Sequence, residues 1–259
     1  MTLDYANVGA HEKVFDLYSG IGTIALSMAT RARQVVGLEI VAPAVADAIA
    51  NAKLNDIQNA KALMIIGGNP AEAHPVSMQH MLRAKEHNRA PFIVIDPRFT
   101  RTAAHATDYI RIRPGTDIPV IWGMLWHIFK NGWEDKEFIR QRVYGMEDAK
   151  KEIMKWTPEE VERVTGVPGE QLKRVAELFA KQKPSTLIWC MGATQHTVGT
   201  ANVRAFCIAL LATGNVGAPG TGANIFRGHT NVQGATDLGL DIVTLPLYYG
   251  LAEGAWRHW

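Results

Sequence analysis

Cysteine is scarce in this sequence: Cys190 and Cys207 are the only two among its 259 residues. Two thiols are too few for a four-cysteine zinc site or for an iron–sulfur cluster, so we expect neither in this chain. Both lie in apolar sequence, which favours buried thiols over metal ligands. Low cysteine usage is typical of a reducing compartment, and the sequence therefore predicts a cytoplasmic protein.

An excess of one charge is also absent. The 27 Lys and Arg residues against 25 Asp and Glu give a net charge of +2. Without a basic run, the sequence predicts no nucleic-acid partner. It has no apolar run of about 18 residues and no signal-like N-terminus, so we expect no membrane association. The nine histidines include no closely spaced metal-binding pair, and no metal ligand is predicted.

Apolar residues make up 47% of the sequence, which is sufficient for the core of one large domain or two small ones. Short apolar segments alternate with turns and with segments of helical periodicity. This alternation predicts an α/β fold of three layers, with a Rossmann-like, mainly parallel sheet and helices on both faces. The expected strands are residues 14–18, 34–40, 63–66, 92–95, 109–112 and 186–190.

Residues 213–239 are rich in glycine and show almost no helix or strand pattern, which predicts a long ordered loop near the C-terminus. So many glycines let a backbone pass close to a bulky ligand. Arg227 is the one full positive charge in this stretch, and its planar guanidinium suits a small carboxylate. A glycine-rich surface linker explains the composition equally well.

Several predicted strands end in glycine or polar turns. Residues 67–69 (Gly-Gly-Asn) follow the strand at 63–66, and residues 96–98 (Asp-Pro-Arg) follow the next one. Ligands of parallel α/β sheets bind at such carboxyl ends. A pyrophosphate suits the positive charge near these turns, although a solvated loop edge is the simpler explanation of any single arginine. The arginines are Arg98, Arg101, Arg111 and Arg113.

A glycine motif follows the first predicted strand. Residues 20–25 (G-I-G-T-I-A) fit G-x-G-x-x-G/A, and Glu39 lies nineteen residues after the first glycine. Together they predict a β-α-β-α unit in which the glycines admit a ligand and Glu39 accepts hydrogen bonds from ribose hydroxyls. A purely structural role explains the unit as well.

The sequence D-L-Y-S-G-I-G-T-I-A-L, followed by V-V-G-L-E-I, resembles the S-adenosylmethionine site of RNA uracil-5-methyltransferases. The resemblance extends over about residues 12–57. The resemblance implies S-adenosylmethionine contacts at Asp16, Gly20, Gly22 and Glu39. Ser19 stands where that family often has cysteine. The family's nucleophilic cysteine, catalytic base and RNA-binding parts have no counterpart in this sequence.

A second resemblance covers about residues 55–259. The stretches G-N-V-G-A-P-G-T-G and R-G-H-T-N-V-Q-G-A-T-D-L-G resemble the catalytic subunit of formate dehydrogenases, which belong to the molybdopterin oxidoreductases. The resemblance implies molybdopterin guanine dinucleotide with Mo or W as cofactor, formate as substrate and other formate dehydrogenase subunits as partners. Taken together, the two resemblances imply three parts: a methyltransferase-like unit at 1–57, a cofactor-binding α/β domain at 58–229, and the start of a further domain at 230–259.

The same resemblance assigns roles to individual residues. It places Asn69 and Glu72 near phosphate and ribose, Asp96 and Arg98 beside the guanosine, and Asp117 at the guanine ring. The last assignment is chemically reasonable, because guanine offers two adjacent N–H donors and a carboxylate offers two acceptors. The remaining implied contacts are Gly115, Met191, Gln195 and His229 for the cofactor, and Arg227 as the catalytic residue that orients formate.

The family's metal-ligating cysteine or selenocysteine, followed by histidine, lies upstream of the position equivalent to residue 55, where this sequence has the methyltransferase-like unit. The sequence as given is therefore expected to be a chimera or fragment with no formate oxidation of its own. Two alternatives stay open at this point. One is a nucleotide binder of the methyltransferase type, and the other is an inactive fusion product.

Overall fold

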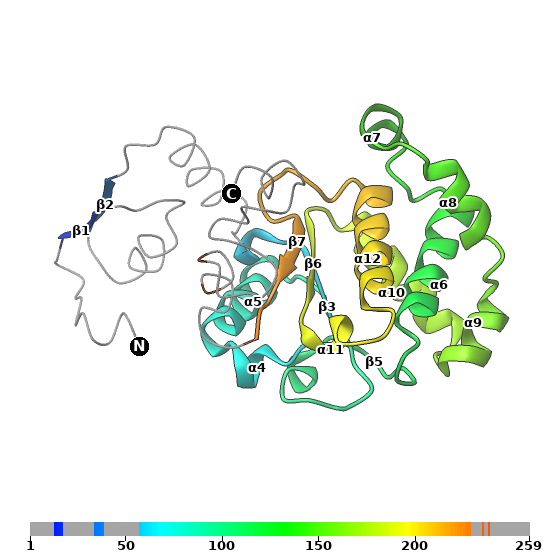
Figure 1. Cartoon of the computed structure of the whole chain (residues 1–259), viewed down its shortest axis with the longest axis horizontal. Helices are drawn as coiled ribbons and strands as arrows, with labels where there is room; N and C mark the ends of the chain where they lie inside the picture. The colour runs from blue at the N-terminus through cyan, green and yellow to red at the C-terminus, as the bar shows by residue number, and fades with distance from the viewer. Residues whose placement is uncertain (1–12, 18–33, 39–56, 229–234, 236–237, 239–259) are drawn as a thin grey trace, which may run out of the picture.

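The computed structural model describes residues 13–17, 34–38, 57–228, 235 and 238 (Figure 1). Its centre is a five-stranded sheet in which every pairing is parallel. In chain order the strands are β3 (Ala62–Ile66), β4 (Phe92–Ile95), β5 (Asp108–Ile110), β6 (Ser185–Trp189) and β7 (Gly222–Ile225). The predicted α/β class with a mainly parallel sheet is confirmed.

The strand order is β5-β4-β3-β6-β7. The chain begins this sheet at its centre, moves outward to β4 and β5, then returns to the other side of β3 to form β6 and β7. The neighbours β3 and β6 are thus the pair at which the direction of winding reverses, with Met64 opposite Leu187. In open α/β sheets, ligands bind beyond the carboxyl ends of the strands at this reversal.

Helices cover both faces of the sheet (Figure 1). The α-helices are α4 (Pro70–Ala73), α5 (Pro75–Asn88), α6 (Asp117–Lys130), α7 (Lys136–Arg142), α8 (Met146–Ile153), α9 (Pro158–Thr165), α10 (Gly169–Lys181), α11 (Met191–Thr194) and α12 (Gly199–Thr213). Two short 3-10 helices are also described, η1 (Ile57–Asn59) and η2 (Ala103–His105). Figure 1 shows α5 on one side of the sheet, and α6, α10 and α12 on the other.

The side chains of β3 divide between two hydrophobic cores, as the alternation along a strand requires. Leu63 and Ile65 belong to the core that includes Met81 of α5. Met64 and Ile66 belong to the larger core under α6, α10 and α12. Because both faces are covered, every residue of β3 is buried, which explains why its sequence is an unbroken apolar run.

The helical layer is joined to the edge of the sheet opposite the strands' carboxyl ends through Asp135. Its carboxylate caps α7 by accepting from the Phe138 N–H at 3.0 Å, and it pairs with Lys183 Nζ at 2.8 Å. Its backbone N–H donates to the Ala212 carbonyl at the end of α12. The side chain and backbone of this one residue therefore fix where α7 begins relative to the start of β6 and to α12.

Two sequence-based expectations about the strands are wrong. The first two predicted strands, β1 (Lys13–Leu17) and β2 (Gln34–Leu38), form a separate parallel pair and do not join the five-stranded sheet. Residues 222–225 were expected to be loop but form β7. β7 is an edge strand, and backbone hydrogen bonding to β6 holds it without the apolar run that identifies a buried strand.

Candidate functional site

Because all five strands are parallel, the segments that follow them meet along one edge of the sheet. The segments after β3 and β6 are direct neighbours there. Gly192 N donates to the Gly67 carbonyl at 3.1 Å. Gly67 has φ of +62°, and a Cβ added to it would lie 2.5 Å from Ala193 N. Gly67 and Gly192 let the backbones of the two segments come into direct contact. This contact forms the base of the candidate site at the carboxyl edge of the sheet.

Cys190 lies directly beneath this contact. A Cβ at Gly68 would lie 2.5 Å from the Cys190 sulfur, so the thiol occupies the space that a larger residue 68 would need. Burial raises the pKa of Cys190 to about 11, and the thiol is therefore protonated at neutral pH. The sequence predicted a buried thiol, whereas the structure describes Cys190 as half-buried.

Asn69 joins the segment after β3 to the segment after β4. Its side-chain amide donates to Glu72 Oε2 at 2.7 Å, and its carbonyl oxygen accepts from the buried Thr102 hydroxyl at 2.8 Å. Thr102 Oγ1 in turn accepts from the Ala71 N–H at 3.0 Å. Sequence analysis missed Thr102, since a threonine in a polar turn gives no signal of such a contact.

Two of the four arginines expected to attract a pyrophosphate have partners within the protein. Arg101 Nε lies 3.3 Å from Glu72 Oε1. Arg113 donates to the Val164 carbonyl at 3.0 Å and to that of Arg163, which caps the end of α9. Arg98 and Arg111 are exposed, and no ion pair holds either of them within residues 57–228. The free positive charge at this edge is thus smaller than the sequence suggested.

Asp117 begins α6 and is 4% exposed. Burial raises the pKa of Asp117, the charge of Asp96 raises it further, and its own backbone N–H and the charge of His196 oppose the rise. Within residues 57–228, no other residue donates a hydrogen bond to its carboxylate. Asp96 is half-buried, and burial raises its pKa despite the Arg98 N–H, which donates to it at 2.8 Å. The two aspartates expected at one site thus lie near each other.

His196 also belongs to this site, although the sequence pattern assigned it no role there. Its Nε2 lies 2.8 Å from the Gly192 carbonyl oxygen. A carbonyl only accepts, so this nitrogen carries the hydrogen. His196 thus lies next to the Gly67–Gly192 contact and within electrostatic range of Asp117. The signal that could have found it is its position directly after Gln195, in the turn that leaves β6.

Of the other expected site residues, some are described by the structure and the rest lie outside the described residues. Met191 and Gln195 bound α11 and are exposed, and Arg227 is an exposed residue just beyond β7. A Cβ at Gly228 would lie 4.0 Å from Met191 Cγ, which places the segment after β7 beside the turn after β6. Gly115 has φ of +80° and open space around it. Gly20, Gly22, Glu39 and His229 lie outside the described residues, and of Asp16 only the backbone in β1 is described.

The sequence matches a known family over nearly its whole length. Residues 8–250 match the family described as molybdopterin oxidoreductase. The chain belongs to the molybdopterin oxidoreductase family. This match includes residues 12–57, and the methyltransferase interpretation of that segment gains no support from it.

Curated relatives of the chain include formate dehydrogenases. The chain is 40% identical over 186 residues to F420-dependent formate dehydrogenase 1 subunit alpha of Methanococcus maripaludis, covering 72% of this chain and 27% of that protein. It is 37% identical over 210 residues to formate dehydrogenase H of Escherichia coli, covering 81% and 29%. The chain thus spans less than a third of the length of these relatives.

A solved structure shares the fold of the chain. Acetylene hydratase from Pelobacter acetylenicus superposes with a TM-score of 0.57 at 21% identity, over 82% of this chain and 31% of that one. At this identity the likeness shows the fold alone. Among the described residues, no helix has the length and apolar character needed to cross a membrane.

Proposed function

We propose that this formate dehydrogenase-like segment binds one guanosine diphosphate arm of molybdopterin guanine dinucleotide at the carboxyl ends of its strands. The observation that carries the proposal is the strand order. It brings the segments after β3 and β6 into contact and gathers Asn69, Asp96, Asp117 and Met191 along the same edge. When bound, the cofactor supplies the Mo or W centre at which formate is oxidised to carbon dioxide.

The residues at this edge fit such a group in two respects. Asp117 is a buried carboxylate to which no other residue in the described part donates, so its acceptors are available to the two adjacent N–H donors of guanine. Gly115 presents its backbone beside open space, two residues before Asp117, so a ring system can approach closely. Asp96 and Arg98 would then contact the guanosine, and Gln195 and His229 the remainder of the cofactor.

Two parts of the proposal concern substrate and partners. Arg227 is exposed at the same edge, and its guanidinium would hold the formate carboxylate in a bidentate manner. Several relatives are named as an alpha or major subunit of a formate dehydrogenase. We therefore propose that the complete protein acts on formate together with other subunits.

The role of Asp117 can be tested by substitution. Asp117→Asn keeps the size of the side chain but removes the charge and one acceptor, so we expect about a tenfold loss of affinity for the guanine dinucleotide form of the pterin, or ~1.4 kcal/mol. Isothermal titration calorimetry measures the change. Asp148→Asn, at an exposed position of α8, is the matched control. Equal affinities of wild type and Asp117→Asn would remove this residue from the site.

The raised pKa of Asp117 gives a pH dependence with a defined sign. The ionised form accepts from guanine, so affinity should fall as pH is lowered through the raised pKa, above the ordinary value of 3.8. The unliganded protein shows the opposite slope: since the folded pKa exceeds the unfolded one, this group's contribution to stability is present at low pH and is lost as pH rises through that pKa.

Dissociation constants of wild type and Asp117→Asn, measured across this pH range, isolate the contribution of Asp117 from those of Asp96 and His196. We expect the variant to lose the part of the slope that comes from Asp117. Parallel pH profiles for the two proteins would show that another group controls binding.

A further inference from the structure

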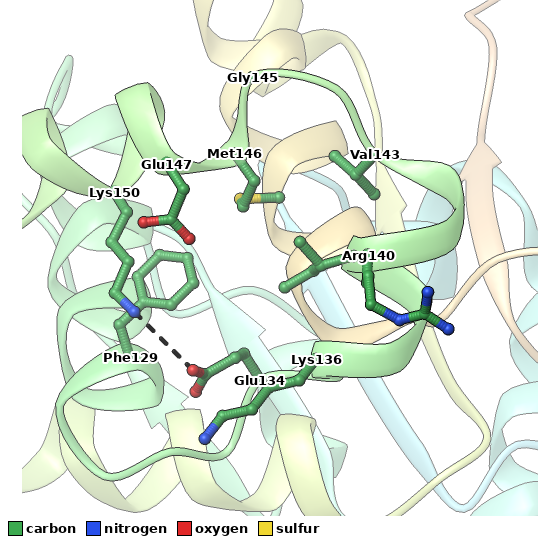
Figure 2. Close-up of a pocket in the computed structure, with 10 residues that line it drawn as sticks. Phe129, Glu134, Lys136, Arg140, Val143, Gly145, Met146, Glu147 and Lys150 are labelled. Carbon is green, nitrogen blue, oxygen red and sulfur yellow. Dashed lines mark ion pairs between the residues drawn. The ribbon is translucent and has the colours of Figure 1, made fainter.

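A pocket lies in the helical layer, away from the carboxyl ends of the strands. It has a volume of about 540 Å³ and lies between the end of α6, α7 and the first turn of α8 (Figure 2). Asp117 begins α6 at the proposed nucleotide site, and Phe129 of the pocket lies almost at the other end of that helix, about 18 Å away at 1.5 Å per residue. Its apolar lining is formed by Phe129, Ile139, Val143 and Met146.

Glu134 provides the most unusual group in this pocket. Its side chain is only 7% exposed. Oε1 lies 3.8 Å from Lys150 Nζ, which is too long for a hydrogen bond, and Oε2 is buried with no hydrogen-bond partner. A buried carboxylate without a hydrogen bond is energetically unfavourable, so a ligand that donates a hydrogen bond to it would be stabilising. The last torsion of glutamate is broad, and rotation about it brings either oxygen toward the pocket.

The space beside Glu134 already suits a cation. Lys150 Nζ lies 5.1 Å from the centre of the Phe129 ring, within the range of a cation–π contact. Lys150 is 33% exposed and makes no hydrogen bond in the described part of the chain, so its flexible side chain can move to solvent. Its present position therefore marks where a bound ammonium group would lie.

The other charged side chains agree with a cationic ligand. Figure 2 shows the Glu147 carboxylate directed into the pocket, while the Lys136 ammonium and the Arg140 guanidinium point away from it. Arg140 is paired with Glu137 outside the pocket, at 2.6 Å. Two carboxylates and one ammonium thus face the pocket, and when Lys150 moves out, two negative charges remain.

We propose that this pocket binds a small organic ammonium compound: a primary amine on a short aliphatic chain. The ammonium group lies between Glu134 and the Phe129 ring, and the aliphatic chain packs against Ile139, Val143 and Met146. This site is independent of the nucleotide site, since it shares no residue with the carboxyl edge of the sheet.

The first test compares three probes of equal length, pentylammonium, pentanol and pentanoate, each titrated into the 259-residue protein and followed by ligand-observed NMR. We expect pentylammonium to bind at least about tenfold more tightly than either of the others, as a charge-assisted hydrogen bond requires. Preferential binding of pentanoate, or no binding of pentylammonium, overturns the proposal.

Two substitutions place the site. Glu134→Gln keeps the shape of the side chain and should weaken the binding of pentylammonium at least about tenfold, whereas Glu152→Gln, at an exposed position of α8 that does not line the pocket, should have no effect. Lys150→Met removes the resident cation and should strengthen binding. If Glu134 and Lys150 form only a structural pair, Lys150→Met lowers the melting temperature with no gain in affinity, and that result also overturns the proposal.

Discussion

Replacing Gly67 by alanine is expected to destabilise the protein by about 3 kcal/mol or more. Two costs add at this position. The left-handed backbone at φ of +62° penalises any residue with a Cβ, by about 1–2 kcal/mol. The new Cβ would also lie 2.5 Å from Ala193 N, and no side-chain rotation relieves a contact with backbone. The segments after β3 and β6 must therefore separate, and urea unfolding measures the loss.

Gly115→Ala is the matched control for this experiment. Gly115 also has a left-handed backbone, with φ of +80°, but a Cβ there would meet nothing within 4 Å. Gly115→Ala should lower the free energy of unfolding only by the conformational cost of the left-handed backbone, about 1–2 kcal/mol. Equal losses for the two variants would show that the close approach of Gly67 to Ala193 contributes nothing to stability.

Arg227→Lys is expected to lower kcat/KM for formate about 100-fold in a longer polypeptide that also carries the family's metal-ligating segment. This expectation rests on the proposed function. Lysine keeps the charge but loses the planar fork that binds a carboxylate through two parallel hydrogen bonds. A small substrate with one carboxylate has no other group by which to be oriented, so misplacement affects the chemical step directly.

The control for this experiment is Arg204→Lys, an exposed arginine of α12 outside the proposed site. It should leave formate turnover unchanged. Measuring initial rates over a range of formate concentrations separates kcat from KM. An unchanged kcat/KM for Arg227→Lys would refute its role in orienting formate.

The sequence was most informative about the buried part of the sheet. β3 and β6 are covered on both faces, so each is a run of apolar or small residues that stands out from its surroundings. β7 was missed for the opposite reason, because Ala223 and Ile225 are exposed on an edge strand. The pairing of β1 with β2 alone was also missed, since periodicity identifies strands but not the sheet to which they belong.

The candidate site, like the sheet, could be predicted from the sequence only in part. Asn69 and Asp96 could be grouped from sequence because parallel strands place their exit turns on one edge. Which partner each side chain has could not be predicted. Arg113 and Arg98 look equivalent in the sequence, yet Arg113 caps α9 and Arg98 is exposed. His196 acquires its place near Asp117 only when β6 lies next to β3.

The strand order also constrains how this domain folds. Ala62 pairs with Ser185, so the central contact of the sheet closes a loop of about 120 residues. The β3–β4–β5 half joins segments that are close in the sequence, and it can form while the rest of the chain is still being synthesised. Until β6 arrives, the apolar edge of β3 is a site for pairing with another chain. The site proposed to bind the nucleotide is thus among the last parts of the domain to form. We expect misassembly to begin at the β3–β4–β5 half while the edge of β3 is still unpaired.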